Sequence, residues 1–316
     1  MIVDTHVAAV SRSRDDPKLG ELIMKDKFFL FLRKLYRPRA GGEGMQRPST
    51  IEDYLQAMES LSVEKLVIHS VGYYPETCEA LNDATSSLCA KYPEQLVGFA
   101  TISLAYPEES VRELDRAVKD LGLKGLKIYP KYQGVKLDSE EMRPVYKKAE
   151  ELGIPILTHS DSYTASYTGY GLKEIDNTAC NTGRLFRSGI LSDTPKLKMI
   201  LAHLGGGIMF DKDFLYALSR WLAKPDEENP EVYFDRLFNQ LYYDLAPANW
   251  YSEKTVRMAI DLVGEDRIFF GTDFPVPEEG LNGVKRSIEH VKSFNLPESV
   301  KKKILGENAK RFLNLK

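Results

Sequence analysis

The chain has 316 residues, of which 43% are hydrophobic and 28% are charged. This composition is typical of a globular protein with a sizeable core, and the length suits one large domain or two ordinary ones. The 43 lysines and arginines nearly balance 46 acidic residues, giving a net charge of −3. No overall positive field results, so a nucleic-acid partner is disfavoured.

The cysteines and the first residues indicate the compartment. The three cysteines are widely spaced and form no Cys-x-x-Cys pair, so neither a disulfide framework nor a cysteine-bound zinc is expected. The opening MIVDTHVAAV lacks the basic region and cleavage site of a secretory signal. The early apolar run 28–32 is too short to cross a bilayer. We therefore expect a cytoplasmic protein with no membrane partner.

Eight short apolar or β-branched runs alternate with longer segments of helical period. The candidate strands are residues 2–8, 65–71, 96–102, 125–129, 154–159, 197–203, 241–245 and 267–272. Amphipathic helices are expected between them, for example at 107–121 and 139–152. This α/β alternation predicts parallel pairing through right-handed crossovers. Eight units favour a single (β/α)₈ TIM barrel over residues 1–316, although a doubly wound sheet has the same local pattern.

A long insertion, residues 9–50, separates the first strand from the next helix, which Ser49 and Glu52 open with capping-box spacing. Its segment 25–39 is basic and aromatic. One interpretation is a small helix docked on the barrel or a contact in a homodimer. The other is a lid whose arginines (Arg33, Arg37 and Arg39) meet a substrate carboxylate.

Histidines and an aspartate follow several predicted strands at their carboxyl ends. His6, His159 and His203 end the first, fifth and sixth strands, and Asp273 follows the eighth. In a (β/α)₈ barrel these ends face the active site. Strand alternation places Asp4 on the same face as His6. Imidazoles and carboxylates that converge from separate strands predict a divalent-metal site, with zinc as the expected ion.

Other polar residues are weaker candidates. Lys127 and Tyr129 point inward if their strand alternates from Leu126, and they could bind a small-molecule substrate. Asp244 ends the seventh strand and is a further substrate-binding candidate. His69 ends the second strand and could line the pocket, but a hydrogen-bonded structural role is the favoured interpretation.

Several motifs together resemble a known family. They are VDTHVA in the first strand, THS after the fifth, AHLGGG at 202–207, DLVGEDRIFFGTDFP at 261–275 and ILGENAKRFLNL near the end. In this order they resemble the amidohydrolase superfamily, most of all its amidohydrolase-related branch. That branch contains hydrolases, lactonases and non-oxidative decarboxylases, and its fold is a (β/α)₈ barrel.

The resemblance implies roles for individual residues. His159 matches the metal ligand of the fifth strand. Asp273 matches an aspartate that binds the metal and accepts a proton from metal-bound water. His203 matches a histidine that acts on the substrate or activates water.

One position departs from the pattern. The family's first strand usually reads Asp-x-His-x-His, but Ala8 stands where the second histidine is expected. Three outcomes are open. Metal binds weakly through His6, His159 and Asp273, metal is lost, or Asp4 and His6 are both ligands, as in the carboxylate-x-His variant of the decarboxylases.

The sequence predicts a metal-dependent hydrolase that cleaves a small organic ester, lactone or amide through metal-activated water. The first alternative is a non-oxidative decarboxylase, a carbon–carbon lyase, acting on a small unsaturated or aromatic carboxylic acid. The second alternative is a barrel that has lost catalysis and serves as a binding subunit, which Ala8 alone supports.

Overall fold

The computed structural model describes residues 1–8, 16–30, 49–159, 178–222, 229–275 and 280–315. The strands are β1 (Val3–Ala8), β2 (Lys65–His69), β3 (Leu96–Thr101), β4 (Gly125–Ile128), β5 (Ile156–Thr158), β6 (Met199–Leu201), β7 (Leu241–Asp244) and β8 (Ile268–Phe269). The helices are α1 (Pro17–Lys25), α3 (Ile51–Leu61), α4 (Pro75–Lys91), α5 (Pro107–Lys119), α6 (Pro130–Gln133), η1 (Glu140–Met142), α7 (Arg143–Glu151), α8 (Thr178–Arg187), α9 (Ile190–Asp193), η3 (His203–Asp211), α10 (Lys212–Leu222), α11 (Pro230–Phe238), η4 (Ala248–Trp250), α12 (Glu253–Val263), η5 (Glu265–Arg267), α13 (Leu281–Ser293), α14 (Glu298–Lys302), η6 (Lys303–Glu307) and α15 (Asn308–Phe312).

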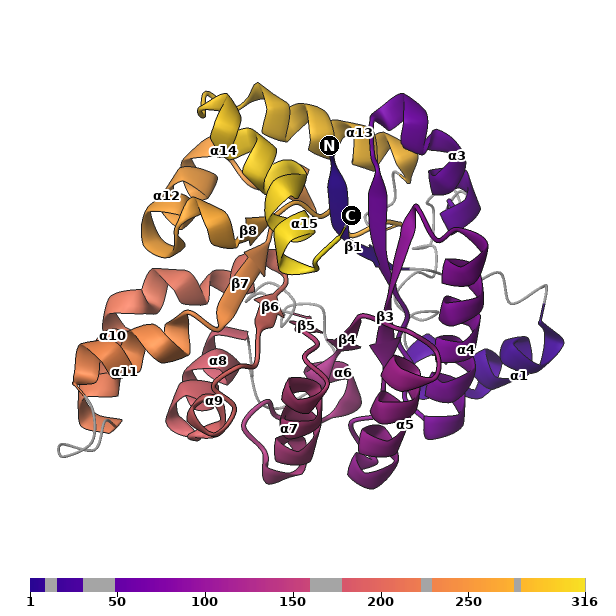
Figure 1. Ribbon diagram of the computed structural model, residues 1–316, viewed down its shortest axis with the longest axis horizontal. Coiled ribbons are helices and arrows are strands. Elements are labelled where there is room, and N and C mark those ends of the chain that lie inside the picture. The colour runs from indigo at the N-terminus through magenta and orange to yellow at the C-terminus, as the bar shows by residue number, and fades with distance from the viewer. Residues whose placement is uncertain (9–15, 31–48, 160–177, 223–228, 276–279, 316) are drawn as a thin grey trace, which may run out of the picture.

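The eight strands form one parallel sheet in the order β1 to β8, surrounded by helices (Figure 1). Two backbone hydrogen bonds join β1 to the segment around β8. The amide of Thr5 donates to the carbonyl of Phe270 at 3.0 Å, and that of Ala8 donates to Phe274 at 2.7 Å. The predicted (β/α)₈ barrel is therefore confirmed.

Every observed strand lies within its predicted range. The helix after the insertion differs slightly, because its capping box is formed by Thr50 and Asp53 and not by Ser49 and Glu52. The amide of Thr50 donates to the Asp53 carboxylate at 2.6 Å, and the amide of Asp53 donates to Oγ1 of Thr50 at 3.3 Å. The capping box lies one residue later than predicted because the hydroxyl of Thr50 accepts the hydrogen bond from the amide of Asp53, the third residue of the helix.

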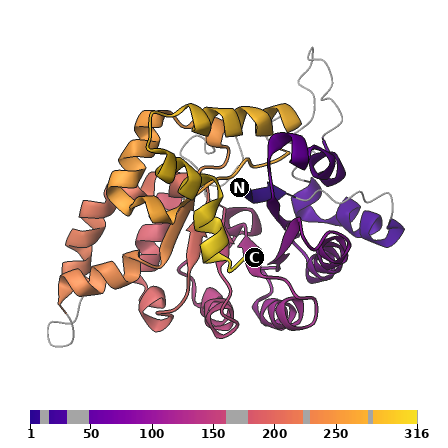
Figure 2. The same ribbon diagram turned by 45° about the horizontal axis from the view of Figure 1, so that its top comes forward.

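An apolar layer fills the barrel on the amino-terminal side of the histidines. Its buried side chains come from most of the strands: Val3, Val67, Val97, Phe99, Leu157, Ile200 and Phe269. Helix α15 packs on β1 and β8 and adds Ala309 to this layer (Figure 2). Because apolar side chains occupy this end, the polar strand ends gather at the opposite one, as expected for a barrel enzyme.

The register of β1 changes along its length. Asp4 pairs with Leu66, but Val7 pairs with Ile68, so β1 uses one more residue than β2 between these pairs. Such an irregularity breaks the alternation of side chains. Asp4 and His6 therefore do not share a face, which corrects the expectation from regular alternation.

Part of the insertion is described, and it packs on the barrel. Helix α1 lies against α4 (Figure 1). The buried carboxylate of Asp26 accepts hydrogen bonds from the amides of Phe28 (2.8 Å), Tyr73 (2.9 Å) and Tyr74 (3.2 Å). Asp26 thus fastens the insertion to the loop after β2.

The rest of the insertion is outside the described residues. This includes Arg33, Arg37 and Arg39, and most of the segment 25–39. No helix in the described ranges combines the length and the apolar character needed to cross a membrane.

Candidate metal centre

Four predicted residues meet at the carboxyl ends of the strands. The ligand atoms of His6, His203 and Asp273 all lie within 4.8 Å of one another. Nε2 of His6 is 3.5 Å from Oδ1 of Asp273. Nε2 of His159 is 3.3 Å from Nε2 of His203, so His159 adjoins the same group.

These separations suit a shared cation. Two ligand atoms about 2.1 Å from one ion at a tetrahedral angle stand about 3.4 Å apart. The His6–Asp273 and His159–His203 distances both agree with that spacing. Two imidazoles and a carboxylate are also ligands that zinc, manganese and similar ions accept. The residues therefore fit a divalent metal.

Asp244 fixes the orientation of His6. Its Oδ2 accepts a 2.9 Å hydrogen bond from Nδ1 of His6, so the lone pair of His6 is on Nε2, toward Asp273. Its Oδ1 accepts hydrogen bonds from the amides of His203 (2.9 Å) and Ala246 (3.0 Å). The sequence predicts a substrate contact for Asp244, whereas the structure shows a carboxylate that holds two histidines in place.

His203 is held by its backbone and by one ring nitrogen. Its Nδ1 donates to the carbonyl of Ala246 at 2.5 Å, which leaves the lone pair on Nε2. Its φ is 56°, and that of Asp273 is 57°, so both residues adopt the left-handed conformation that side chains disfavour. Strain of this kind, of order 1–3 kcal/mol, is typical of functional sites. The following glycines, 205–207, also have positive φ and allow the tight turn that the sequence indicates.

Burial sets the charge of the cluster. It lowers the pKa of His203 to about 4 and that of His6 well below 6.5, so both imidazoles are neutral. It raises the pKa of Asp273 to about 8 and lowers that of Lys127 to about 7. The buried carboxylate of Asp273 therefore lacks full compensation for a negative charge, which a divalent cation would provide.

Lys127 and Tyr129 point into the barrel, as predicted. Nζ of Lys127 is 3.2 Å from Nε2 of His6 and 4.8 Å from the centre of the Tyr129 ring. The Tyr129 ring stacks on His159 at 4.9 Å and lies 5.6 Å from Phe28 of the insertion. Phe28 thus contributes to the wall of the site, a role that the sequence does not reveal.

Asp4 lies outside the cluster. Its carboxylate accepts hydrogen bonds from the hydroxyls of Tyr54 (2.8 Å) and Thr272 (2.5 Å) and from the amides of Thr272 (3.0 Å) and His6 (3.2 Å). Burial raises its pKa to about 6, against the opposing effect of these hydrogen bonds. Asp4 is among the sequence-predicted ligands, but the structure uses it to join β1, α3 and the end of β8.

His69 is the polar residue that sequence reasoning misjudged. It is 1% exposed, and its ring centre is 5.0 Å from that of His6. Neither ring nitrogen has a hydrogen-bond partner among the described residues. The expectation of a hydrogen-bonded structural histidine is therefore wrong.

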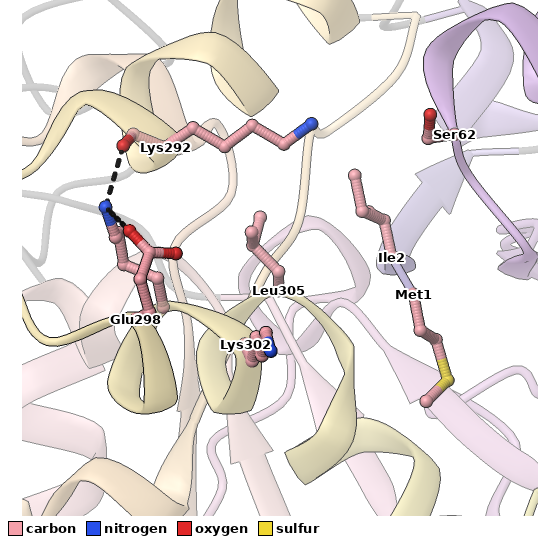
Figure 3. Close-up of a pocket in the computed structure, with 8 residues that line it drawn as sticks. Met1, Ile2, Ser62, Lys292, Glu298, Lys302 and Leu305 are labelled. Carbon is pink, nitrogen blue, oxygen red and sulfur yellow. Dashed lines mark hydrogen bonds and ion pairs between the residues drawn. The ribbon is translucent and has the colours of Figure 1, made fainter.

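A separate cavity of about 370 Å³ lies near the start of β1 (Figure 3). It is lined by Met1, Ile2, Ser62, Lys292, Glu298, Lys301, Lys302 and Leu305. Nζ of Lys301 is 2.5 Å from the Glu298 carboxylate and 3.1 Å from the Lys292 carbonyl. The cavity is at the amino ends of the strands, the face of this fold that serves stability and not catalysis.

Comparison with known proteins places the site in a family. The model of the family described as Amidohydrolase matches residues 33–315. A 2-amino-3-carboxymuconate-6-semialdehyde decarboxylase of Dictyostelium discoideum is 26% identical over 258 residues, covering 76% of this chain and 67% of its own. A gamma-resorcylate decarboxylase of Rhizobium sp. strain MTP-10005 is 24% identical over 287 residues, covering 83% and 86% of the two chains.

Solved structures share the fold. A 5-carboxyvanillate decarboxylase from Novosphingobium aromaticivorans, complexed with manganese, has a TM-score of 0.77 at 20% identity, covering all of this chain and 96% of its own. A 2,6-dihydroxybenzoate decarboxylase complexed with 2,6-dihydroxybenzoate has a TM-score of 0.75 at 21% identity, covering 99% of both chains.

These findings correct the first choice of reaction. The four similar proteins named above are decarboxylases, so the prediction of a hydrolase is wrong and the alternative of a decarboxylase is better supported. The cluster of two histidines and an aspartate, together with manganese in a similar structure, supports a divalent metal. It does not single out zinc.

Proposed function

Because this chain belongs to the amidohydrolase family, we propose that it removes carbon dioxide, without oxidation, from a small aromatic or unsaturated carboxylic acid. The observation that carries the proposal is the convergence of His6, His203 and Asp273, with His159 3.3 Å from His203, in a chain that is similar to the two curated decarboxylases named above. The alternative of a barrel without catalysis is not favoured, because this group assembles without a histidine at position 8.

We assign the cation to His6, His159 and Asp273, with His203 beside it. When bound, a divalent cation supplies positive charge that stabilises negative charge developing on substrate oxygens. Asp244 keeps the lone pair of His6 turned toward Asp273. Asp4 is proposed to hold the strand and not the metal, because both of its oxygens accept hydrogen bonds from Tyr54 or Thr272.

Lys127 is a basic side chain that lies against this centre, with Nζ 3.2 Å from Nε2 of His6. Its amine and a metal ion compete for one lone pair on Nε2 of His6. In the metal-loaded protein Lys127 is therefore available to a substrate carboxylate, while Tyr129 and Phe28 offer aromatic faces and exclude water.

His203 is proposed to carry the proton. The bond between the substrate carbon and its carboxylate breaks, and the electron pair stays on that carbon. Nε2 of His203, which holds a lone pair in the neutral ring, first accepts a proton from solvent and then passes it to that carbon, so that the new carbon–hydrogen bond forms and carbon dioxide leaves. Burial, which lowers the pKa of His203 to about 4, makes this proton easy to release.

The test is carbon dioxide release by manganese-loaded and zinc-loaded protein from a panel of hydroxylated benzoic acids and unsaturated acids. We expect one carbon dioxide and one decarboxylated product for each acid consumed. A panel without release from either metal form, or release unaffected by His203→Asn, would overturn the proposal. The comparison of the two metals ranks manganese against zinc.

A further inference from the structure

His69 closes strand β2 within the ring of polar side chains at the barrel mouth. Its register partner on β1 is Ala8, and its ring lies 5.0 Å from His6 and 6.3 Å from Tyr129, measured between ring centres. Only 1% of its surface is exposed. It therefore belongs to the wall of the site.

Among the described residues, no group forms a hydrogen bond with either ring nitrogen of His69. Within the described ranges, neither Nδ1 nor Nε2 of His69 has a partner, whereas His6 bonds to Asp244 and His203 to the Ala246 carbonyl. Ala8, on the adjoining strand, has no polar side-chain atom to offer. A buried polar group without a hydrogen-bond partner destabilises the fold. Such a group beside a candidate reactive centre therefore favours a bound ligand that supplies the missing hydrogen bonds.

The chemistry of the ring defines the missing partner. A neutral imidazole offers one N–H donor and one acceptor. A carboxylate only accepts, and it already has Lys127 and the metal centre as partners. A hydroxyl both donates and accepts, so it complements His69 better.

We propose that His69 recognises a hydroxyl group on the ring or enol of the substrate and so selects hydroxylated acids over their deoxy analogues. The inference rests on the proposed function, because it names a feature of the acid that the metal centre would decarboxylate. His69 is on this view a specificity residue and takes no part in breaking the bond.

The test measures binding and not turnover. Calorimetric titrations of manganese-loaded protein compare benzoate with 2-hydroxybenzoate, 3-hydroxybenzoate and 2,6-dihydroxybenzoate. We expect wild type to bind at least one hydroxylated acid more tightly than benzoate by about tenfold or more. In His69→Leu the preference should fall at least fivefold or vanish while benzoate affinity is retained. His69→Asn, which keeps a donor and an acceptor, should retain part of the preference.

A purely structural role would give a different pattern. His69→Leu would then weaken both classes of acid equally and lower the melting temperature, and this result would overturn the proposal. A preference for hydroxylated acids that survives in His69→Leu, or that is absent from wild type, would also overturn it. If discrimination depends on His69 but no carbon dioxide is released, the proposed reaction fails and the assignment of His69 stands.

Discussion

The buried carboxylate of Asp244 accepts a hydrogen bond of 2.9 Å from Nδ1 of His6, and this contact determines which nitrogen of His6 faces Asp273. The same carboxylate receives the backbone amide of His203. One side chain on β7 therefore positions histidines of β1 and of the segment after β6.

Asp244→Asn should weaken metal binding. An amide can offer an N–H to Nδ1 of His6 and so disfavour the tautomer with its lone pair toward Asp273. We expect manganese affinity to fall about 10–100-fold, as measured by titration calorimetry. Asp235→Asn, at an exposed position of α11, is the matched control and should leave the affinity unchanged. Equal affinities for wild type and Asp244→Asn would contradict this role.

Removal of the metal should abolish turnover. Dialysis against a chelator is expected to lower carbon dioxide release by about 100-fold or more, and added manganese should restore it. Asp273→Asn should not recover under the same treatment, because it lacks a charged ligand. Full activity of protein shown by elemental analysis to be metal-free would refute the requirement.

His203→Asn separates proton transfer from metal binding. We expect metal content to stay near that of wild type while carbon dioxide release falls by about 10²–10⁴-fold. His6→Ala should instead lose the metal. If His203→Asn also lost the metal, His203 would be a ligand, and its assignment as proton carrier would be wrong.

The barrel was predictable from sequence because eight apolar runs recur at regular positions, and His6, His159, His203 and Asp273 follow from where those runs end. The position of the Asp4 side chain could not be predicted in this way. Regular alternation places Asp4 on the same face as His6, whereas the register shift before Val7 turns it toward Tyr54. Local periodicity does not reveal an extra residue in one strand of a pair.

The choice between hydrolysis and decarboxylation and the position of Phe28 were also beyond the sequence. A metal centre of this composition suits both hydrolysis and decarboxylation, so the preference for decarboxylation comes from the relatives and not from the ligands. Phe28 enters the site through packing between distant segments, which no local pattern encodes.

Asp26→Ala should loosen the insertion. It leaves three amide donors, those of Phe28, Tyr73 and Tyr74, without their carboxylate. Each unsatisfied donor costs about 1–3 kcal/mol where water cannot reach it. We expect faster hydrogen exchange at these amides and a higher KM. Glu21→Gln removes only an exposed ion pair of α1 and should change neither. Unaltered hydrogen exchange at these amides in Asp26→Ala would contradict the role of Asp26 in holding the insertion to the barrel.

His69 should make stability depend on pH. In the unfolded chain it titrates near the usual value of about 6.5, and in the folded protein burial holds its pKa well below that. Between the two values the unfolded state binds a proton that the folded state does not, so the free energy of unfolding falls as the pH falls. Relative to His69→Leu, metal-free wild type should lose up to about 1.4 kcal/mol for each unit below pH 6.

Denaturant unfolding of both proteins at several pH values provides the measurement. A difference in unfolding free energy that does not vary with pH would show that His69 titrates normally in the folded state.

Because Phe28 packs on Tyr129, the site is built from two separate parts of the chain, the barrel and the insertion. The residues proposed to hold the cation come from the ends of the barrel strands, whereas one aromatic wall of the site comes from the insertion, which Asp26 ties to the loop after β2. Selection can therefore change that wall, and with it the range of acids that bind, without changing the residues proposed to hold the cation and to carry the proton. Mutations in the insertion would then change which acids bind, while the reaction at the strand ends stays the same.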